Sequence, residues 1–177
     1  GRPAAIISFL DCVSVKRPTV DHCRELGRAL VGLDHAGRAF RMARANSLSV
    51  EAWRPLFEQA GSQADTVAVG LTKRTLADLA LLEKSWPLDL PSGVIHADLF
   101  TDNAFFTGDE LSGIIDFYFA CTDAPAYDLA ICLNASCLQA AGRSARAMGA
   151  ALIAGYLDPR PLYSPAVQSS PTLARGA

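Results

Sequence analysis

Apolar residues that recur every three or four positions after residue 19 predict the first well-marked helix of the chain. Four of them form one apolar stripe, as on a helix that packs one face against a core: Cys23, Leu26, Leu30 and Leu33. Thr19 precedes the stripe as a candidate N-cap, because its hydroxyl oxygen can accept a hydrogen bond from a backbone N–H of the first turn. Gly37 follows the stripe as a candidate C-terminal stop.

Four further segments carry helical patterns, and they are residues 47–60, 71–86, 123–138 and 143–156. The third is apolar nearly all round, so we expect it to lie at the centre of the fold. Residues 61–70 are small and polar, which predicts a connection between two helices.

Strand patterns occupy the beginning and the middle of the chain. Residues 4–10 form an apolar run that predicts a buried strand, and Val94-Ile95 predicts a very short one. Residues 104–117 read as a β-hairpin whose turn contains Gly108 and Asp109. A buried strand needs neighbours and none precedes residue 4, so we expect that N-terminal sequence is missing.

The composition excludes several classes of function. Apolar residues make up 50% of the chain, and the formal net charge is −2. This charge argues against a nucleic-acid surface, because binding to the phosphate backbone needs an excess of Lys and Arg. The apolar stretch 126–138 is interrupted by Asp128 and Asn134 and is too short to span a membrane, and the N-terminus does not resemble a signal peptide.

The five cysteines are odd in number and form no C-x-x-C pair: Cys12, Cys23, Cys121, Cys132 and Cys137. We expect reduced thiols that act as small core residues, and neither a zinc site nor a disulfide framework. Together with the composition, this predicts a cytoplasmic protein that binds a small molecule, with no nucleic-acid or membrane partner.

Two carboxylates and a carboxamide form the candidate catalytic set. Asp98 and Asn103 lie in one segment after a short strand, and Asp116 ends the hairpin that returns the chain to this segment. A single Asp is more often a turn or cap residue, but three oxygen donors in this order suit magnesium, which keeps waters and substrate phosphates as its other ligands. Asp102 either braces the same loop or adds a further donor.

The chemistry of these side chains suggests their roles. Asp98 is the candidate base that accepts the proton of a substrate hydroxyl and orients that oxygen toward a terminal phosphate. Asn103 and Asp116 are the candidate magnesium ligands. His96 and Asp128 are expected to support the site by holding the catalytic loop through hydrogen bonds.

These segments resemble the signature of the aminoglycoside phosphotransferase and choline kinase superfamily. The signature appears as His96-Ala-Asp98-x-x-x-x-Asn103, then Ile115-Asp116, then Tyr127-Asp128-Leu-Ala. The longer run from Gly93 to Ala135 resembles the homoserine kinase branch of that superfamily. Enzymes of this branch phosphorylate the side-chain hydroxyl of homoserine with ATP, on the way to threonine.

The resemblance implies an α+β fold, namely the mostly helical C-terminal lobe of a protein-kinase-like phosphotransferase with a small catalytic β-hairpin. It implies a hinge strand at residues 1–10, a helical catalytic lobe at 11–157 and a truncated C-terminal segment at 158–177. It also implies ATP and Mg²⁺ as cofactors. The family's N-terminal lobe, which carries a lysine that contacts the ATP phosphates, would be absent from this chain.

Several alternatives remain open at the level of sequence. The acceptor is homoserine or another small alcohol, such as an amino alcohol or an aminoglycoside. The chain is otherwise a non-catalytic kinase-like fragment, or a metal-dependent phosphohydrolase built from the same carboxylates. The sequence identifies neither the residues that bind the nucleotide and the acceptor nor the oligomeric state.

Overall fold

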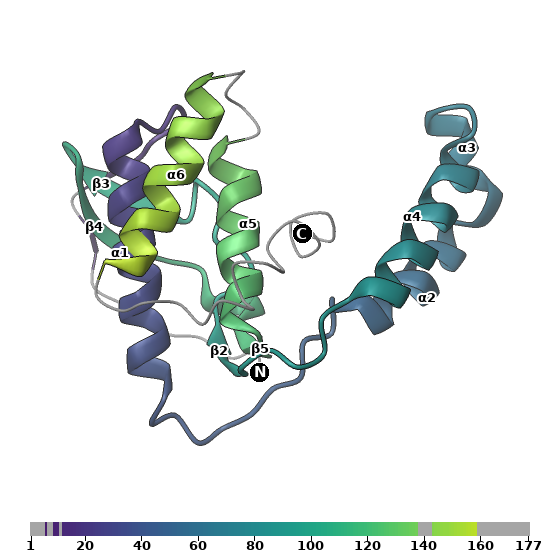
Figure 1. Cartoon of the computed structure of the whole chain (residues 1–177), viewed down its shortest axis with the longest axis horizontal. Coiled ribbons are helices and arrows are strands. Elements are labelled where there is room, and N and C mark those ends of the chain that lie inside the picture. Colours follow the sequence, from purple (N-terminus) through teal and green to yellow (C-terminus); the bar gives the residue numbers. More distant parts are fainter. Residues whose placement is uncertain (1–5, 7–8, 11, 138–142, 159–177) are drawn as a thin grey trace.

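The computed structural model describes residues 6, 9–10, 12–137 and 143–158, and these form a body with a helical arm (Figure 1). In the body, helices α1 (Val20–Gly37), α5 (Pro125–Cys137) and α6 (Arg143–Leu157) pack against two small sheets. The main core lies between these helices and one sheet, and its fully buried side chains include Leu30, Leu99 and Leu152.

Helix α1 begins and ends where the sequence predicts. The Thr19 hydroxyl accepts a hydrogen bond from the His22 backbone N–H at 3.3 Å, and the Thr19 N–H donates to His22 Nδ1 at 3.0 Å. This reciprocal pair satisfies two backbone donors at the helix start. Cys23, Leu26 and Leu30 are buried, as the apolar stripe predicts.

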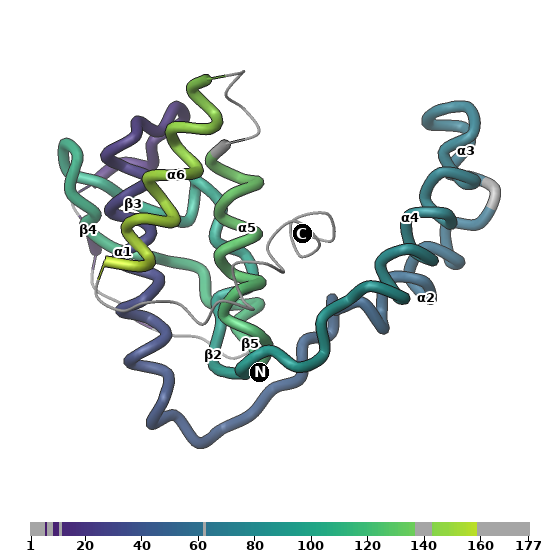
Figure 2. The backbone as a smooth tube through the Cα atoms, in the orientation of Figure 1, coloured from purple at the N-terminus to yellow at the C-terminus, as the bar shows by residue number. Residues whose placement is uncertain are grey.

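Two glycines set the distance between α1 and α6, which run side by side in Figure 2. A Cβ atom added to Gly155 would lie 2.0 Å from the Arg24 backbone oxygen, and one added to Gly27 would lie 2.1 Å from the Leu152 oxygen. Real Cβ atoms do not approach an oxygen so closely, so the backbones can touch here only because both positions lack a side chain.

The predicted hairpin is confirmed as strands β3 (Ala104–Thr107) and β4 (Glu110–Ile114), with Gly108 at φ 61° in the turn. Strand β1 (Val13–Ser14) pairs with β3 and completes an antiparallel sheet of order β1-β3-β4. Strand β2 (Gly93–Ile95) pairs antiparallel with β5 (Cys121–Asp123) in a second sheet, with Ile95 opposite Cys121.

The arm consists of α2 (Val50–Ala60), the short α3 (Ala64–Val67) and α4 (Leu71–Ser85), which extend away from the body on the right of Figure 1. Arg54 on α2 makes two hydrogen bonds of 2.7 Å to the Glu83 carboxylate on α4. Trp86 joins the arm to the body, because its ring lies edge-to-face with Trp53 at 5.0 Å and with Tyr127 of α5 at 5.6 Å.

The structure corrects some details of the sequence prediction. Residues 61–70 contain a 3₁₀ turn and the short helix α3 rather than only a loop. Of the strand predicted at 4–10, the described residues Ile6, Phe9 and Leu10 lie in no strand, and Ile6 and Phe9 are exposed. The remaining residues of that segment, like residues 159–177, lie outside the described part of the chain, so the domain boundaries stay predictions.

The buried cysteines agree with the role predicted for them. Cys23, Cys121 and Cys132 are buried, as expected of small core residues, and Cys12 is partly buried. Within the parts of the chain that the structure places, no helix has the length and apolar character needed to cross a membrane.

Candidate active site

Asp128 shapes the loop that presents Asp98. Its carboxylate is fully buried at the start of α5, where Oδ2 accepts a hydrogen bond from the His96 N–H at 2.7 Å and Oδ1 accepts one from the Ala97 N–H at 2.8 Å. Ala97 has φ 63°, a left-handed conformation that costs a non-glycine residue roughly 1–3 kcal/mol. The Asp128 carboxylate thus holds a strained turn immediately before Asp98. Burial raises the pKa of Asp128, and the two backbone donors oppose this rise.

His96 connects the loop to the segment that carries Asp116. The ring is fully buried, with Nε2 2.8 Å from the Ile115 carbonyl oxygen and Nδ1 3.3 Å from the Asp98 backbone nitrogen. A carbonyl oxygen only accepts and a backbone N–H only donates, so Nε2 carries the hydrogen and Nδ1 accepts. The neutral ring therefore fixes Asp98 and the residue before Asp116 at the same time.

Asn103 folds back onto Asp98, as its spacing predicts. Its Nδ2 donates to the Asp98 backbone oxygen at 2.7 Å and lies 3.4 Å from Asp98 Oδ2. The Ile115 N–H donates to the Asn103 backbone oxygen at 3.0 Å. Within the described residues, no hydrogen bond occupies Asn103 Oδ1 or the exposed Asp116 carboxylate. Both remain open to a ligand.

The carboxylates of the site influence one another. Burial raises the pKa of Asp98, and the negative charges of Asp116 and Asp102 raise it further. Among the described residues, no group of three His, Cys, Asp or Glu side chains is arranged to hold a metal ion. A cation at Asn103 and Asp116 would therefore need oxygen ligands from water or substrate as well, which is how magnesium commonly binds.

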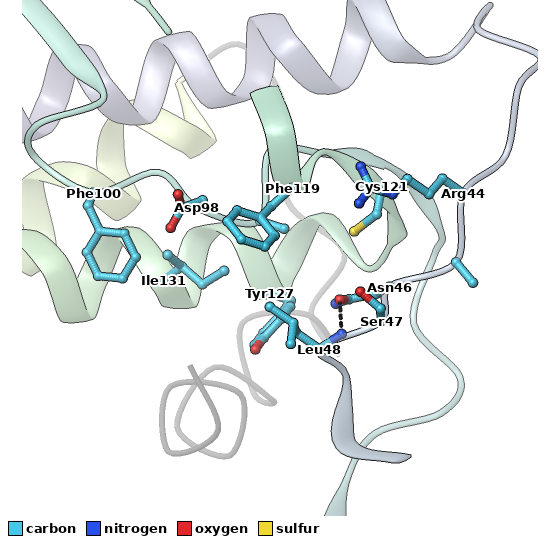
Figure 3. A pocket seen from close by; sticks show the side chains of 12 residues that line it. Arg44, Asn46, Ser47, Leu48, Asp98, Phe100, Phe119, Cys121, Tyr127 and Ile131 are labelled. Carbon is cyan, nitrogen blue, oxygen red and sulfur yellow. Dashed lines mark hydrogen bonds between the residues drawn. The ribbon is translucent and has the colours of Figure 1, made fainter. Parts of the chain in front are cut away.

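A cavity of about 190 Å³ opens beside Asp98 (Figure 3). Asp98 and Phe100 line it from the loop, Cys121 from β5, Tyr127 and Ile131 from α5, and residues 44–48 from the segment between α1 and α2. A water molecule occupies roughly 30 Å³ in the liquid, so this space suits a small organic molecule. An alcohol bound here would have its hydroxyl within the reach of a general base.

Asn46 is fixed at the wall of this cavity. Its Nδ2 donates to Asp123 Oδ2 at 2.7 Å, and its Oδ1 accepts from the Leu48 N–H at 2.9 Å. Sequence reasoning did not assign the segment around Arg44 and Asn46 to the site. The signal in the sequence was that Arg44-Ala-Asn-Ser-Leu48 belongs to the stretch that resembles the family. The place of this segment depends on a long-range contact: the Thr122 N–H donates to the Arg44 oxygen at 2.6 Å.

The structure brings four of the five predicted side chains into one hydrogen-bonded network: His96, Asp98, Asn103 and Asp128. The negative charge of Asp116 raises the pKa of Asp98. Asp116 also follows Ile115, whose carbonyl oxygen is hydrogen-bonded to the His96 ring. The arrangement provides a carboxylate that faces a small cavity and two unpaired oxygen ligands near it.

Comparison with known proteins places this site in context. A family model described as "Phosphotransferase enzyme family" matches residues 1–162. Among the curated relatives, homoserine kinases from Methylobacterium radiotolerans and Xanthobacter autotrophicus are 66% and 58% identical over all 177 residues. The chain spans about half the length of these relatives, namely 55% of each.

Solved structures share the fold. An amicoumacin kinase in complex with AMP-PNP, Ca²⁺ and Ami aligns with a TM-score of 0.68 at 14% identity, and 95% of this chain covers 52% of that one. A macrolide 2'-phosphotransferase from Brachybacterium faecium aligns with a TM-score of 0.64 at 19% identity, and 94% of this chain covers 58% of it. The predicted α+β lobe of a kinase-like phosphotransferase is therefore confirmed.

Proposed function

We propose that this chain, which belongs to the phosphotransferase enzyme family, carries the acceptor side of a homoserine kinase. The reaction moves the terminal phosphoryl group of ATP to the side-chain hydroxyl of homoserine. The observation that carries the proposal is the Asp98 carboxylate at the wall of a small cavity, held by Asp128 and His96.

Asp98 acts as the proton acceptor in this proposal. A hydroxyl in the cavity would donate its hydrogen to the Asp98 carboxylate while its oxygen forms a bond to the terminal phosphorus of ATP, and the bond from that phosphorus to the bridging oxygen would break to release ADP. Burial raises the pKa of Asp98, which makes the carboxylate a stronger base than an exposed one. Proton transfer to a positioned base contributes roughly 10²- to 10⁴-fold to a rate, and the fixed orientation of the oxygen contributes separately.

The donor side needs ATP and a divalent cation, which we propose to be Mg²⁺. When bound, they supply the phosphoryl group and neutralise charge on its oxygens. Asn103 Oδ1 and the Asp116 carboxylate fit the cation, because they are oxygen donors without a hydrogen bond among the described residues. The Asn103 amide is already oriented by its Nδ2 bonds to Asp98.

The test uses a completed protein, defined as this chain joined to the residues of the Methylobacterium radiotolerans relative that it does not cover. Phosphorylation by ATP and Mg²⁺ is measured with homoserine, choline, an aminoglycoside and no acceptor, beside the full-length relative. We expect phosphorylated homoserine and little of the other products. Equal rates on an aminoglycoside would contradict the assigned acceptor, and phosphate release independent of any acceptor would favour a phosphohydrolase.

A further inference from the structure

We propose that Arg44 binds the carboxylate of the acceptor, so that the cavity selects alcohols that carry an anionic group at their far end. The inference deepens the proposed function and relies on it for the placement of the acceptor hydroxyl at Asp98. It assigns a specificity role to a residue outside the catalytic loop.

The position of Arg44 is fixed by three hydrogen bonds to a neighbouring segment. Its Nη1 donates to the Tyr118 carbonyl oxygen at 2.6 Å, and its backbone N–H donates to Thr122 Oγ1 at 3.2 Å. Its own carbonyl oxygen accepts from the Thr122 N–H at 2.6 Å. Among the described residues, Arg44 Nε and Nη2 have no hydrogen-bond partner and no carboxylate within ion-pair distance. The planar guanidinium group of Arg44 can therefore donate from Nε and Nη2 to the two oxygens of a carboxylate.

The charges around the cavity are divided between its walls. Arg44 supplies the positive charge and Asp98 the carboxylate among the described residues that line it, and Figure 3 shows them on opposite sides of Phe119. Phe119 lies between them in this view, and Ile131 also lines the cavity. A small alcohol with its hydroxyl at Asp98 would direct its other end toward Arg44.

This division of charge discriminates between classes of acceptor. An amino acid with a side-chain hydroxyl carries a carboxylate that Arg44 can bind through charge-assisted hydrogen bonds. Choline and aminoglycosides carry cationic groups, which Arg44 would repel. The cavity therefore matches a hydroxy amino acid and disfavours polycationic acceptors.

The test compares two ligands that differ only in the carboxylate. Homoserine and aminopropanol, its analogue without the carboxylate, are titrated into the 177-residue chain without ATP, and ligand-observed NMR gives both dissociation constants. A charged hydrogen bond of this kind corresponds to roughly a tenfold change in affinity. We expect the unmodified chain to bind homoserine about tenfold more tightly than aminopropanol.

Three variants test whether Arg44 causes the preference for homoserine over aminopropanol. Arg44→Met should remove it by weakening homoserine binding, while aminopropanol, whose ammonium group Arg44 repels, should bind at least as tightly as before, which also shows that the cavity has kept its structure. Arg44→Lys should restore part of the preference, and Arg41→Met, an exposed arginine that does not line the cavity, should retain all of it. A preference that survives in Arg44→Met, or that the unmodified chain lacks, would overturn the inference.

The binding test is independent of catalysis. If the carboxylate preference depends on Arg44 but the completed protein does not phosphorylate homoserine, then the proposed function fails and the binding site stands. If the completed protein phosphorylates homoserine and the preference is unchanged in Arg44→Met, then the Arg44 inference alone fails.

Discussion

Replacing Gly155 by alanine tests the packing that supports the active-site body. Gly155 is buried on α6 where this helix meets α1, and an added Cβ would lie 2.0 Å from the Arg24 oxygen and 2.9 Å from the Arg24 carbonyl carbon. These are backbone atoms, so they cannot move away by a change of rotamer. The helices would have to separate.

The magnitude follows from two opposing effects. Alanine in place of glycine favours a helix by about 1 kcal/mol. Even weak carbon–oxygen contacts need about 3.3 Å, so the helices would separate by more than an ångström along a tightly packed interface. Overpacking of this kind typically costs about 1–3 kcal/mol and occasionally more. After the gain in helix propensity is subtracted from this cost, we expect Gly155→Ala to lower the free energy of unfolding by up to about 2 kcal/mol.

Gly32→Ala is the matched control. Gly32 is exposed on α1, and nothing lies within 4 Å of an added Cβ, so this variant should gain up to about 1 kcal/mol. Urea denaturation followed by circular dichroism measures both variants of the 177-residue chain. Opposite signs support the close approach of α1 and α6, whereas a gain of stability in Gly155→Ala would refute it.

Two further predictions concern buried carboxylates. Asp128→Ala leaves the buried N–H groups of His96 and Ala97 without an acceptor and should cost about 1–3 kcal/mol for each. An unchanged urea midpoint would argue against the role of the Asp128 carboxylate in holding this turn. Burial raises the pKa of Asp34, which accepts a hydrogen bond from the Tyr156 hydroxyl, from 3.8 to about 6. Because the folded state then holds the Asp34 proton more tightly, the contribution of Asp34 to stability is greatest below about pH 4 and is lost as the pH rises through 6. The amide introduced by Asp34→Asn cannot ionise, so the urea midpoint of this variant should rise relative to that of the unmodified chain as the pH increases from about 4 to 6. If the difference between the two midpoints did not change with pH, the raised pKa of Asp34 would be contradicted.

Local patterns were sufficient to predict α1 and the hairpin. The start of α1 depends on Thr19 and on the apolar spacing that follows it, and the hairpin depends on Gly108 and on alternating burial in β3. Strand β5 carried no such signal, because Cys121–Asp123 is a strand only through its pairing with Gly93–Ile95. The partner strand lies far away in sequence, and no short window contains both.

Some features of the candidate site could likewise be predicted from local sequence, and others could not. The proximity of Asn103 to Asp98 follows from their spacing on one loop, and the structure shows the predicted contact. The left-handed turn at Ala97 and the position of Arg44 could not be predicted, since the first depends on a carboxylate from α5 and the second on pairing with Thr122. The catalytic and metal-binding roles themselves stay predictions.

The turnover number of Asp98→Asn in the completed protein tests the central claim most directly. The amide keeps the shape of the side chain but cannot accept the hydroxyl proton as a base, so turnover on homoserine should fall roughly 10²- to 10⁴-fold while KM for ATP changes little. Asp89→Asn, which changes an exposed carboxylate outside the site, should retain full turnover. If Asp98→Asn turned over homoserine as fast as the unmodified protein, Asp98 would not be the base and the account would be wrong.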